Sequence, residues 1–151
     1  MSESATAVAP EQLACDDPTL LPIPSGGTAT TVYISVTADG TKLVPAFSLS
    51  PTGTAFKGGM CSPQDPEFGL FLNFQFLFSQ LGTILNIDNA DPPTPGLWYS
   101  KAQLPAPVGG FSQQCCTQNV AGEYHFEVTI RDHNNKLHRV DPKIVVTPPH
   151  I

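Results

Sequence analysis

Residues 68–79 read FGLFLNFQFLFS, and this stretch decides the fold that we expect. Phenylalanine or leucine occupies every second position from Phe68 to Phe78, and the positions between them are more polar apart from Phe71 and Leu77. Successive side chains of a strand point to opposite faces, whereas a helix would spread the six alternating residues around its circumference. The stretch therefore predicts a half-buried β-strand.

Two further segments, residues 30–37 and 123–131, alternate between apolar and polar residues in the same way. Turn residues follow both segments, at positions 39–40 and 132–135, so each is expected to form a hairpin with the strand that comes next. Pro45 lies in the return strand of the first hairpin. Because proline has no N–H to donate, we expect that strand at a sheet edge or at a bulge.

The composition and length argue for a single domain without long helices. The chain has 151 residues, of which 12 are glycine and 16 are proline, and no segment has helical periodicity. We expect an all-β, immunoglobulin-like β-sandwich of about seven to eight strands, with a small barrel as the alternative. Residues 1–29 are expected to form an irregular acidic leader, pinned by Leu20, Leu21 and Ile23, and residues 30–151 the sandwich domain.

The charge is low and unevenly spread along the chain. Charged residues make up 13% of the chain, the formal net charge is −6, and no Lys or Arg precedes Lys42. The cations that follow are matched by acidic residues, so neither nucleic acid nor an anionic membrane surface is an expected partner. Polar residues interrupt the most apolar run, residues 68–87, so we expect no membrane span. Without a basic region for a secretory signal we expect cytoplasmic localisation, with leaderless export left open.

The adjacent pair Cys115 and Cys116 is the most unusual local feature of the sequence. Thiolates bind soft and borderline metals, but no Cys-x-x-Cys spacing is present, so we expect no metal and no other cofactor. In a reducing compartment the thiols stay reduced. Otherwise a disulfide between Cys61 and either Cys115 or Cys116, or one within the adjacent pair, remains open.

The end of the chain resembles known families. Residues 122–128 read GEYHFEV and residues 141–146 read DPKIVV. This hairpin resembles the closing hairpin of bacterial immunoglobulin-like domains and that of the inclusion-body (PixA/AidA-type) family, in which an aromatic residue commonly precedes Asp-Pro where this chain has Val140. The likeness is confined to this hairpin. It implies a compact cytoplasmic β-sandwich that self-assembles or binds a sugar, and it supplies no catalytic residue.

Aromatic residues supply the candidate binding sites. Trp98, Tyr99 and Tyr33 offer flat rings on which a sugar can stack, although aromatic residues in strands often divide between core and surface. Phe71 and Leu77 lie on the alternate face of the phenylalanine-rich strand. If no other part of the chain covers that face, it is an apolar patch suited to self-association.

One strand face gathers residues that can transfer protons. Glu123, His125 and Glu127 share it with Arg131, and His138 is expected to lie across the hairpin. Carboxylates beside an imidazole can act as a general base, but a solvated sheet face shows the same pattern.

These observations predict a non-catalytic binding or self-assembly module. The first expectation is association with itself or with a protein partner through a β-sheet face or edge. Carbohydrate binding is the alternative. An enzyme of unknown type ranks last, because the sequence has no nucleophile elbow, zincin helix or phosphate loop.

Overall fold

The structure, a computed structural model, describes residues 17–23, 30–63, 71–89, 97–99, 113–117 and 122–147, with only the backbone given for residues 63, 97–99 and 117. These residues form strands and turns and contain no helix, which confirms the all-β prediction. In this part of the chain no helix is long and apolar enough to span a bilayer.

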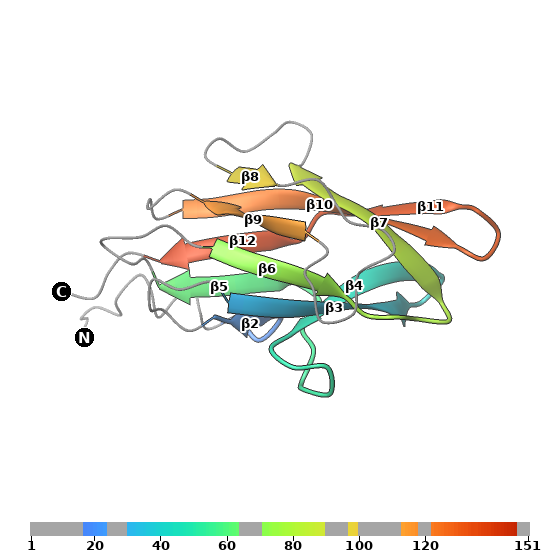
Figure 1. The fold of residues 1–151 in the computed structure, drawn as a ribbon, viewed down its shortest axis with the longest axis horizontal. Helices are drawn as coiled ribbons and strands as arrows, with labels where there is room; N and C mark the ends of the chain where they lie inside the picture. The colour runs from blue at the N-terminus through green and yellow to red at the C-terminus, as the bar shows by residue number, and fades with distance from the viewer. Residues whose placement is uncertain are drawn as a thin grey trace.

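The strands form two mixed sheets, shown in Figure 1. The β3 sheet has the order β4 (Lys42–Ser48), β3 (Thr30–Asp39), β6 (Phe71–Phe76), β9 (Gln113–Thr117) and β8 (Leu97–Tyr99). The β10 sheet contains β7 (Gly82–Asn89), β10 (Gly122–Asp132), β11 (Leu137–Val140), β12 (Lys143–Thr147), β5 (Gly59–Pro63) and β2 (Leu20–Pro22). The prediction of seven to eight strands was too low, because β2 and β5 lie in segments expected to be irregular.

β11 and β12 are two parts of one return strand beside β10. Gly122 pairs with Val146 and Val128 pairs with Val140, so six steps along β10 (128 − 122) match six steps back (146 − 140). The Asp-Pro interruption at residues 141–142 therefore separates two strands without changing their register. This continuity gives the hairpin a single alternation of inward and outward residues along its whole length.

An apolar core fills the space between the two sheets. Both sheets contribute buried side chains, among them Val32, Ile34, Phe47, Leu72 and Phe74 from the β3 sheet and Ile87, Phe126, Val128, Ile130 and Ile144 from the β10 sheet. The rings of Phe47 and Phe126 meet edge to face across the core with their centroids 5.9 Å apart. Such a pair stabilises the fold beyond the area that it buries.

The phenylalanine-rich stretch is only partly a strand. β6 places Leu72 and Phe74 in the core, as predicted, whereas residues 64–70 lie outside the described residues. Phe78 does not share their face, and its exposed fraction is 90%. The prediction for Phe78 was wrong because β6 ends at Phe76 and the chain then crosses to β7 in the other sheet.

The edges of both sheets are short or already bonded. β4 is the terminal strand of the β3 sheet, as Pro45 predicts, and the N–H groups of Phe47 and Phe56 each donate to the other residue's carbonyl at 2.8 Å. On β7, the N–H of Ile87 donates to Oε1 of Gln113 at 3.0 Å, and Nε2 of Gln113 donates to the carbonyl of Ile87 at 2.6 Å. β2 and β8 have 3 residues each. Such features disfavour edge-to-edge association.

Candidate functional site

The aromatic residues predicted to bind sugar do not form one compact site. Trp98 and Tyr99 lie in β8, where their backbones pair with Cys116 and Cys115, and their side chains lie outside the described residues. Tyr33 lies in β3 and is half-buried. Three strand spacings separate β3 from β8 in the sheet order, so the backbones of Tyr33 and Trp98 are at least about 14 Å apart.

The outer face of the β3 sheet carries uncharged residues, apart from Asp39 and Lys42 at the end of the β3–β4 hairpin. Val32 pairs with Phe74, and both are fully buried in the core, so the alternating pair Tyr33 and Gln75 stands on the opposite side of the sheet. We call this side of the sheet the neutral face. It consists of the half-buried Thr31, Tyr33, Ser35, Thr37, Gln75 and Gln114, the more exposed Phe71, and Asn73, of which only 6% is exposed. Phe71 is 36% exposed there, whereas Leu77 follows the end of β6 and lies beyond the face.

Two amide side chains of the neutral face are held in place by each other. Nε2 of Gln114 donates to Oδ1 of Asn73 at 2.9 Å, which joins β9 to β6 outside the backbone ladder. Amide and hydroxyl groups both donate and accept hydrogen bonds, and none of the eight residues carries a charge. The neutral face can therefore contact an uncharged surface without burying an ion.

The outer face of the β10 sheet has the opposite character. We call it the charged face, and its residues include Asp88, Glu123, His125, Glu127, Arg131, Arg139 and Lys143. Oε2 of Glu123 lies 3.0 Å from Nε2 of His125, and Oε1 of Glu123 accepts a bond from Nζ of Lys143 at 3.3 Å. Partial burial raises the pKa of Glu123, but the bonds from Lys143 and His125 outweigh it and hold that pKa below its ordinary value.

His138 lies across the hairpin from β10, as expected, but it does not join this group. It pairs with the buried Ile130, which places it on the core side of the hairpin, whereas His125 faces outward. Nε2 of His138 lies 2.9 Å from Oδ2 of Asp132, and Nδ1 accepts the N–H of Leu43 at 3.3 Å. Because the Nδ1 atom is an acceptor, the neutral ring carries its proton on Nε2 and donates it to Asp132.

Asp132 organises the turn between β10 and β11. Its Oδ1 accepts the N–H groups of Asn134 and Lys136 at 2.8 and 2.9 Å, and Asn135 has the left-handed φ of 63° that asparagine tolerates. The hydrogen bond from His138 is the main cause that lowers the pKa of Asp132, and the turn N–H groups add to it. The carboxylate thus serves the turn and is not available to a ligand.

The structure has a disulfide between the adjacent residues Cys115 and Cys116, both of which are fully buried. Cys61, on β5 in the other sheet, belongs to a separate disulfide. Neither member of the adjacent pair is therefore bonded to Cys61 in this structure. Among the residues that the structure describes, no three His, Cys, Asp or Glu side chains gather as a set of metal ligands.

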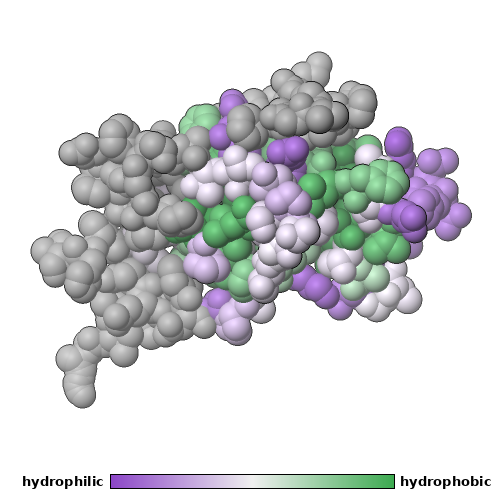
Figure 2. Space-filling view, turned by 60° about the horizontal axis from the view of Figure 1, so that its bottom comes forward, coloured by the Kyte–Doolittle hydropathy of each residue, from purple (hydrophilic) through white to green (hydrophobic). Residues whose placement is uncertain are grey.

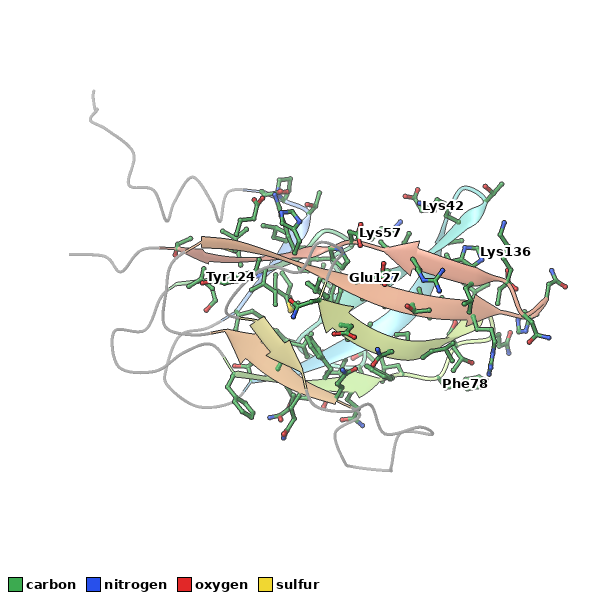
Figure 3. The ribbon with its side chains drawn as sticks, turned by 90° about the horizontal axis from the view of Figure 1, so that it is seen from above. Lys42, Lys57, Phe78, Tyr124, Glu127 and Lys136 are labelled. Atoms are coloured by element: carbon green, nitrogen blue, oxygen red, sulfur yellow. A yellow bond between two sulfur atoms is a disulfide. The ribbon has the colours of Figure 1, made fainter. Side chains whose placement is uncertain are left out.

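One end of the molecule exposes apolar side chains that the sequence interpretation missed. We call it the distal end, and it comprises residues 39–42, 77–81 and 131–137. Figure 3 shows Lys42, Lys136 and Phe78 toward this end, and Figure 2 shows its strongly hydrophilic side chains with hydrophobic ones next to them. Phe78 is 90% exposed, Leu81 43% and Leu137 40%. The turn-like residues after Phe78 were the available signal that the strand ends before it.

No protein-family model matches the chain, and no curated protein matches its sequence. The class that the fold defines is an all-β protein of two mixed sheets around a common core. Its outer surfaces differ in kind: one sheet presents the neutral face and the other the charged face.

Proposed function

We propose that the chain is a non-catalytic binding module and that the neutral face is its binding surface. The observation that carries the proposal is the division of charge between the two outer faces. On the charged face Glu123 already pairs with His125 and Lys143, and a partner would have to desolvate these and the other charged side chains. The sheet edges that the structure describes are short or already hydrogen-bonded, so a partner is better accommodated on a sheet face than at an edge.

The occupant that this surface fits best is a second copy of the chain. When identical faces meet around a two-fold axis, equivalent residues come close to one another. On the charged face this arrangement brings like charges such as Glu123 and Glu127 together, whereas the neutral face has no charge to repel its copy. The half-exposed ring of Phe71 supplies apolar area for such a contact.

Self-assembly also agrees with the resemblance of the closing hairpin to the inclusion-body family. We also propose that the fold is an immunoglobulin-like sandwich and that the protein lies in the cytoplasm. Three strand pairs, β3 with β6, β12 with β5 and β5 with β2, are parallel, which departs from the antiparallel sheets of immunoglobulin domains.

Light scattering across a dilution series tests the proposal. We expect a molar mass that rises with concentration for the natural chain and that stays at the monomer value for Gln75→Glu, which places like charges in the contact. Thr129→Glu, on the charged face, is the matched control and should associate as the natural chain does. A monomer at every concentration, or equal behaviour of the two variants, contradicts self-association through the neutral face.

Binding of a neutral carbohydrate is the second candidate function. It is favoured by the fixed amides of Asn73 and Gln114 beside the half-buried Tyr33 and Gln75, because amides and aromatic rings bind sugar hydroxyls and ring faces without charge. Titration of the fluorescence of Trp98 with a panel of neutral oligosaccharides tests it. We expect saturable quenching that Gln114→Ala weakens, and a flat titration for the whole panel excludes this candidate.

A further inference from the structure

Three apolar side chains are buried on the outer side of the β10 sheet. Leu20 of β2, Cys61 of β5 and Val145 of β12 are 4%, 1% and 8% exposed, and they form a cluster separate from the main core. We call them the outer cluster, and Figure 1 shows β5, their middle strand, between β2 and β12. The adjacent residues Met60 and Ile144 belong to the core, so the outer cluster stands on the opposite side of the sheet.

The outer cluster is covered although its surroundings are open to water. Glu123 of β10 is the register partner of Val145 and faces the same side, and 49% of its side chain is exposed. The strands of the β10 sheet lie beside the outer cluster, and the β3 sheet packs on the core side. Neither sheet lies over these three residues, so a further segment of the chain has to bury them.

The disulfide of Cys61 indicates which segment this is. The chain has four cysteines, Cys15, Cys61, Cys115 and Cys116, and the last two are bonded to each other. Cys61 is also disulfide-bonded, so Cys15 is the partner that the chain leaves for it. Cys15 lies two residues before Asp17, where the described part of the chain begins.

A turn before β2 reverses the direction of the chain. The N–H of Leu20 donates to the carbonyl of Asp17 at 3.2 Å, and Oδ1 of Asp17 accepts the N–H and the hydroxyl of Thr19 at 2.8 and 2.6 Å. Asp17 and Leu20 therefore face each other across the turn. The residues that precede Asp17 are expected to run back along β2.

This reversal brings Cys15 level with the right part of β2. Counting back from the facing pair of residues 17 and 20 sets Cys15 opposite Pro22, which is the register partner of Cys61. At the free edge of β2, Cys15 would be two strand spacings, about 9–10 Å, from Cys61, whereas the Cα atoms of a disulfide are at most about 7 Å apart. The segment has to pass over the outer side of β2 instead, which is where the outer cluster is buried.

We propose that a disulfide between Cys15 and Cys61 closes residues 1–16 over the outer cluster as a redox-controlled cover. In exchange with a small-molecule disulfide, the two thiols lose two protons and two electrons and form the sulfur–sulfur bond, and the small disulfide is reduced to two thiols. The reverse exchange with small thiols opens the cover and exposes the outer cluster. The cover shares no residue with the neutral face, so this proposal and the proposed function stand or fall separately.

Peptide mapping of the full chain tests the bond. Trypsin separates the cysteines into three peptides, residues 1–42, 58–101 and 102–131. After equilibration with oxidised glutathione, blocking of free thiols and digestion without reductant, we expect peptide 1–42 linked to peptide 58–101 and peptide 102–131 linked to neither. A link from peptide 58–101 to peptide 102–131 or to a second copy of itself, or a blocked thiol on Cys61, overturns the proposal.

Cys15→Ser tests the cover. We expect the Cys61 thiol of this variant to react with a maleimide in the folded protein, because the segment above it is no longer tied down. Asp16→Ser is the matched control, which keeps the bond and should show no reactive Cys61. Circular dichroism checks that both variants are folded, and the peptide map decides the bond without any variant. An unreactive Cys61 in folded Cys15→Ser, or equal reaction in the two variants, overturns the proposal.

Discussion

At the scale of single residues, His138 links the two sheets. It lies on the core side of the β10–β11 hairpin, receives the N–H of Leu43 from β4 on one ring nitrogen and contacts Asp132 with the other. A buried polar group with both of its sites bonded is structural, because removing it leaves the partner groups unpaired. The ring is therefore a fixed support for the distal end.

We predict that His138→Ala lowers the free energy of unfolding by about 1–3 kcal/mol, because it leaves the N–H of Leu43 without its bond. His125→Ala removes an exposed imidazole instead and should change the free energy by less than about 0.5 kcal/mol. Urea denaturation of both variants checks this. Equal losses for the two substitutions would show that His138 is not the support described above.

Asp132 makes stability depend on pH in acid. Hydrogen bonds hold its pKa in the folded protein below the ordinary value of 3.8, so the folded state binds the proton less readily than the unfolded state. The stability from Asp132 is therefore complete above about pH 5, well above that value, and is lost as the pH falls through the lowered pKa. The stability difference between the natural chain and Asp132→Asn should be constant from pH 7 to 5 and shrink towards pH 2. A difference that does not change with pH contradicts this role.

At the scale of elements, some strands could be predicted from local sequence and others could not. β3 and β10 alternate over their whole length, so their inward faces are visible without knowledge of their neighbours. β2 and β5 depend on parallel pairing with residues far along the chain, such as Leu21 with Met60 and Met60 with Ile144. Their short, proline- and glycine-containing sequences give no periodic signal.

The candidate surfaces depend on the sheet order in the same way. Tyr33 could be singled out as an aromatic residue, but Gln75 and Gln114 gain their place only because β6 and β9 lie beside β3. The distal end likewise brings together three connecting segments that lie far apart in the sequence. Periodicity shows which way a side chain points in a strand, but not which strand is its neighbour.

The outer edge of β7 provides a prediction at this scale. Gln113 is 2% exposed, and its amide bonds both backbone groups of Ile87, as a neighbouring strand would. Gln113→Ala should lower the free energy of unfolding by about 1–3 kcal/mol and speed hydrogen exchange in β7, because it leaves buried backbone groups unpaired. Gln114→Ala is the neighbouring control with a smaller expected effect. Unchanged exchange in β7 after Gln113→Ala would contradict this account of the edge.

Two glycines with positive φ should respond differently to alanine. Gly59 begins β5 with a φ of 127°, and a Cβ there would collide with the backbone of Lys143, whereas Gly40 has a φ of 66° and open space around it. Gly40→Ala should cost about 1–2 kcal/mol from the left-handed conformation alone. We expect Gly59→Ala to cost clearly more, because the strand must move away from β12. Thermal unfolding compares them, and equal melting temperatures would contradict the close contact.

At the scale of the whole molecule, the two sheets share one core and differ in what they present outward. On the charged face Glu123 pairs with His125 and Lys143, the neutral face lacks charge, and the distal end exposes apolar side chains beside hydrophilic ones. Because these differences arise from the placement of strands, they were hidden in a sequence whose cations and acids balance after the acidic start.

Nuclear magnetic resonance of the side-chain amides tests the central claim most directly. The neutral face carries the amides of Asn73, Gln75 and Gln114, whereas those of Asn134 and Asn135 lie in the turn of the distal end. We predict that raising the protein concentration shifts or broadens the first set and leaves the second set unchanged. If the neutral-face amides keep the same resonances in dilute and concentrated solution, and with neutral oligosaccharides present, the neutral face is not a binding surface.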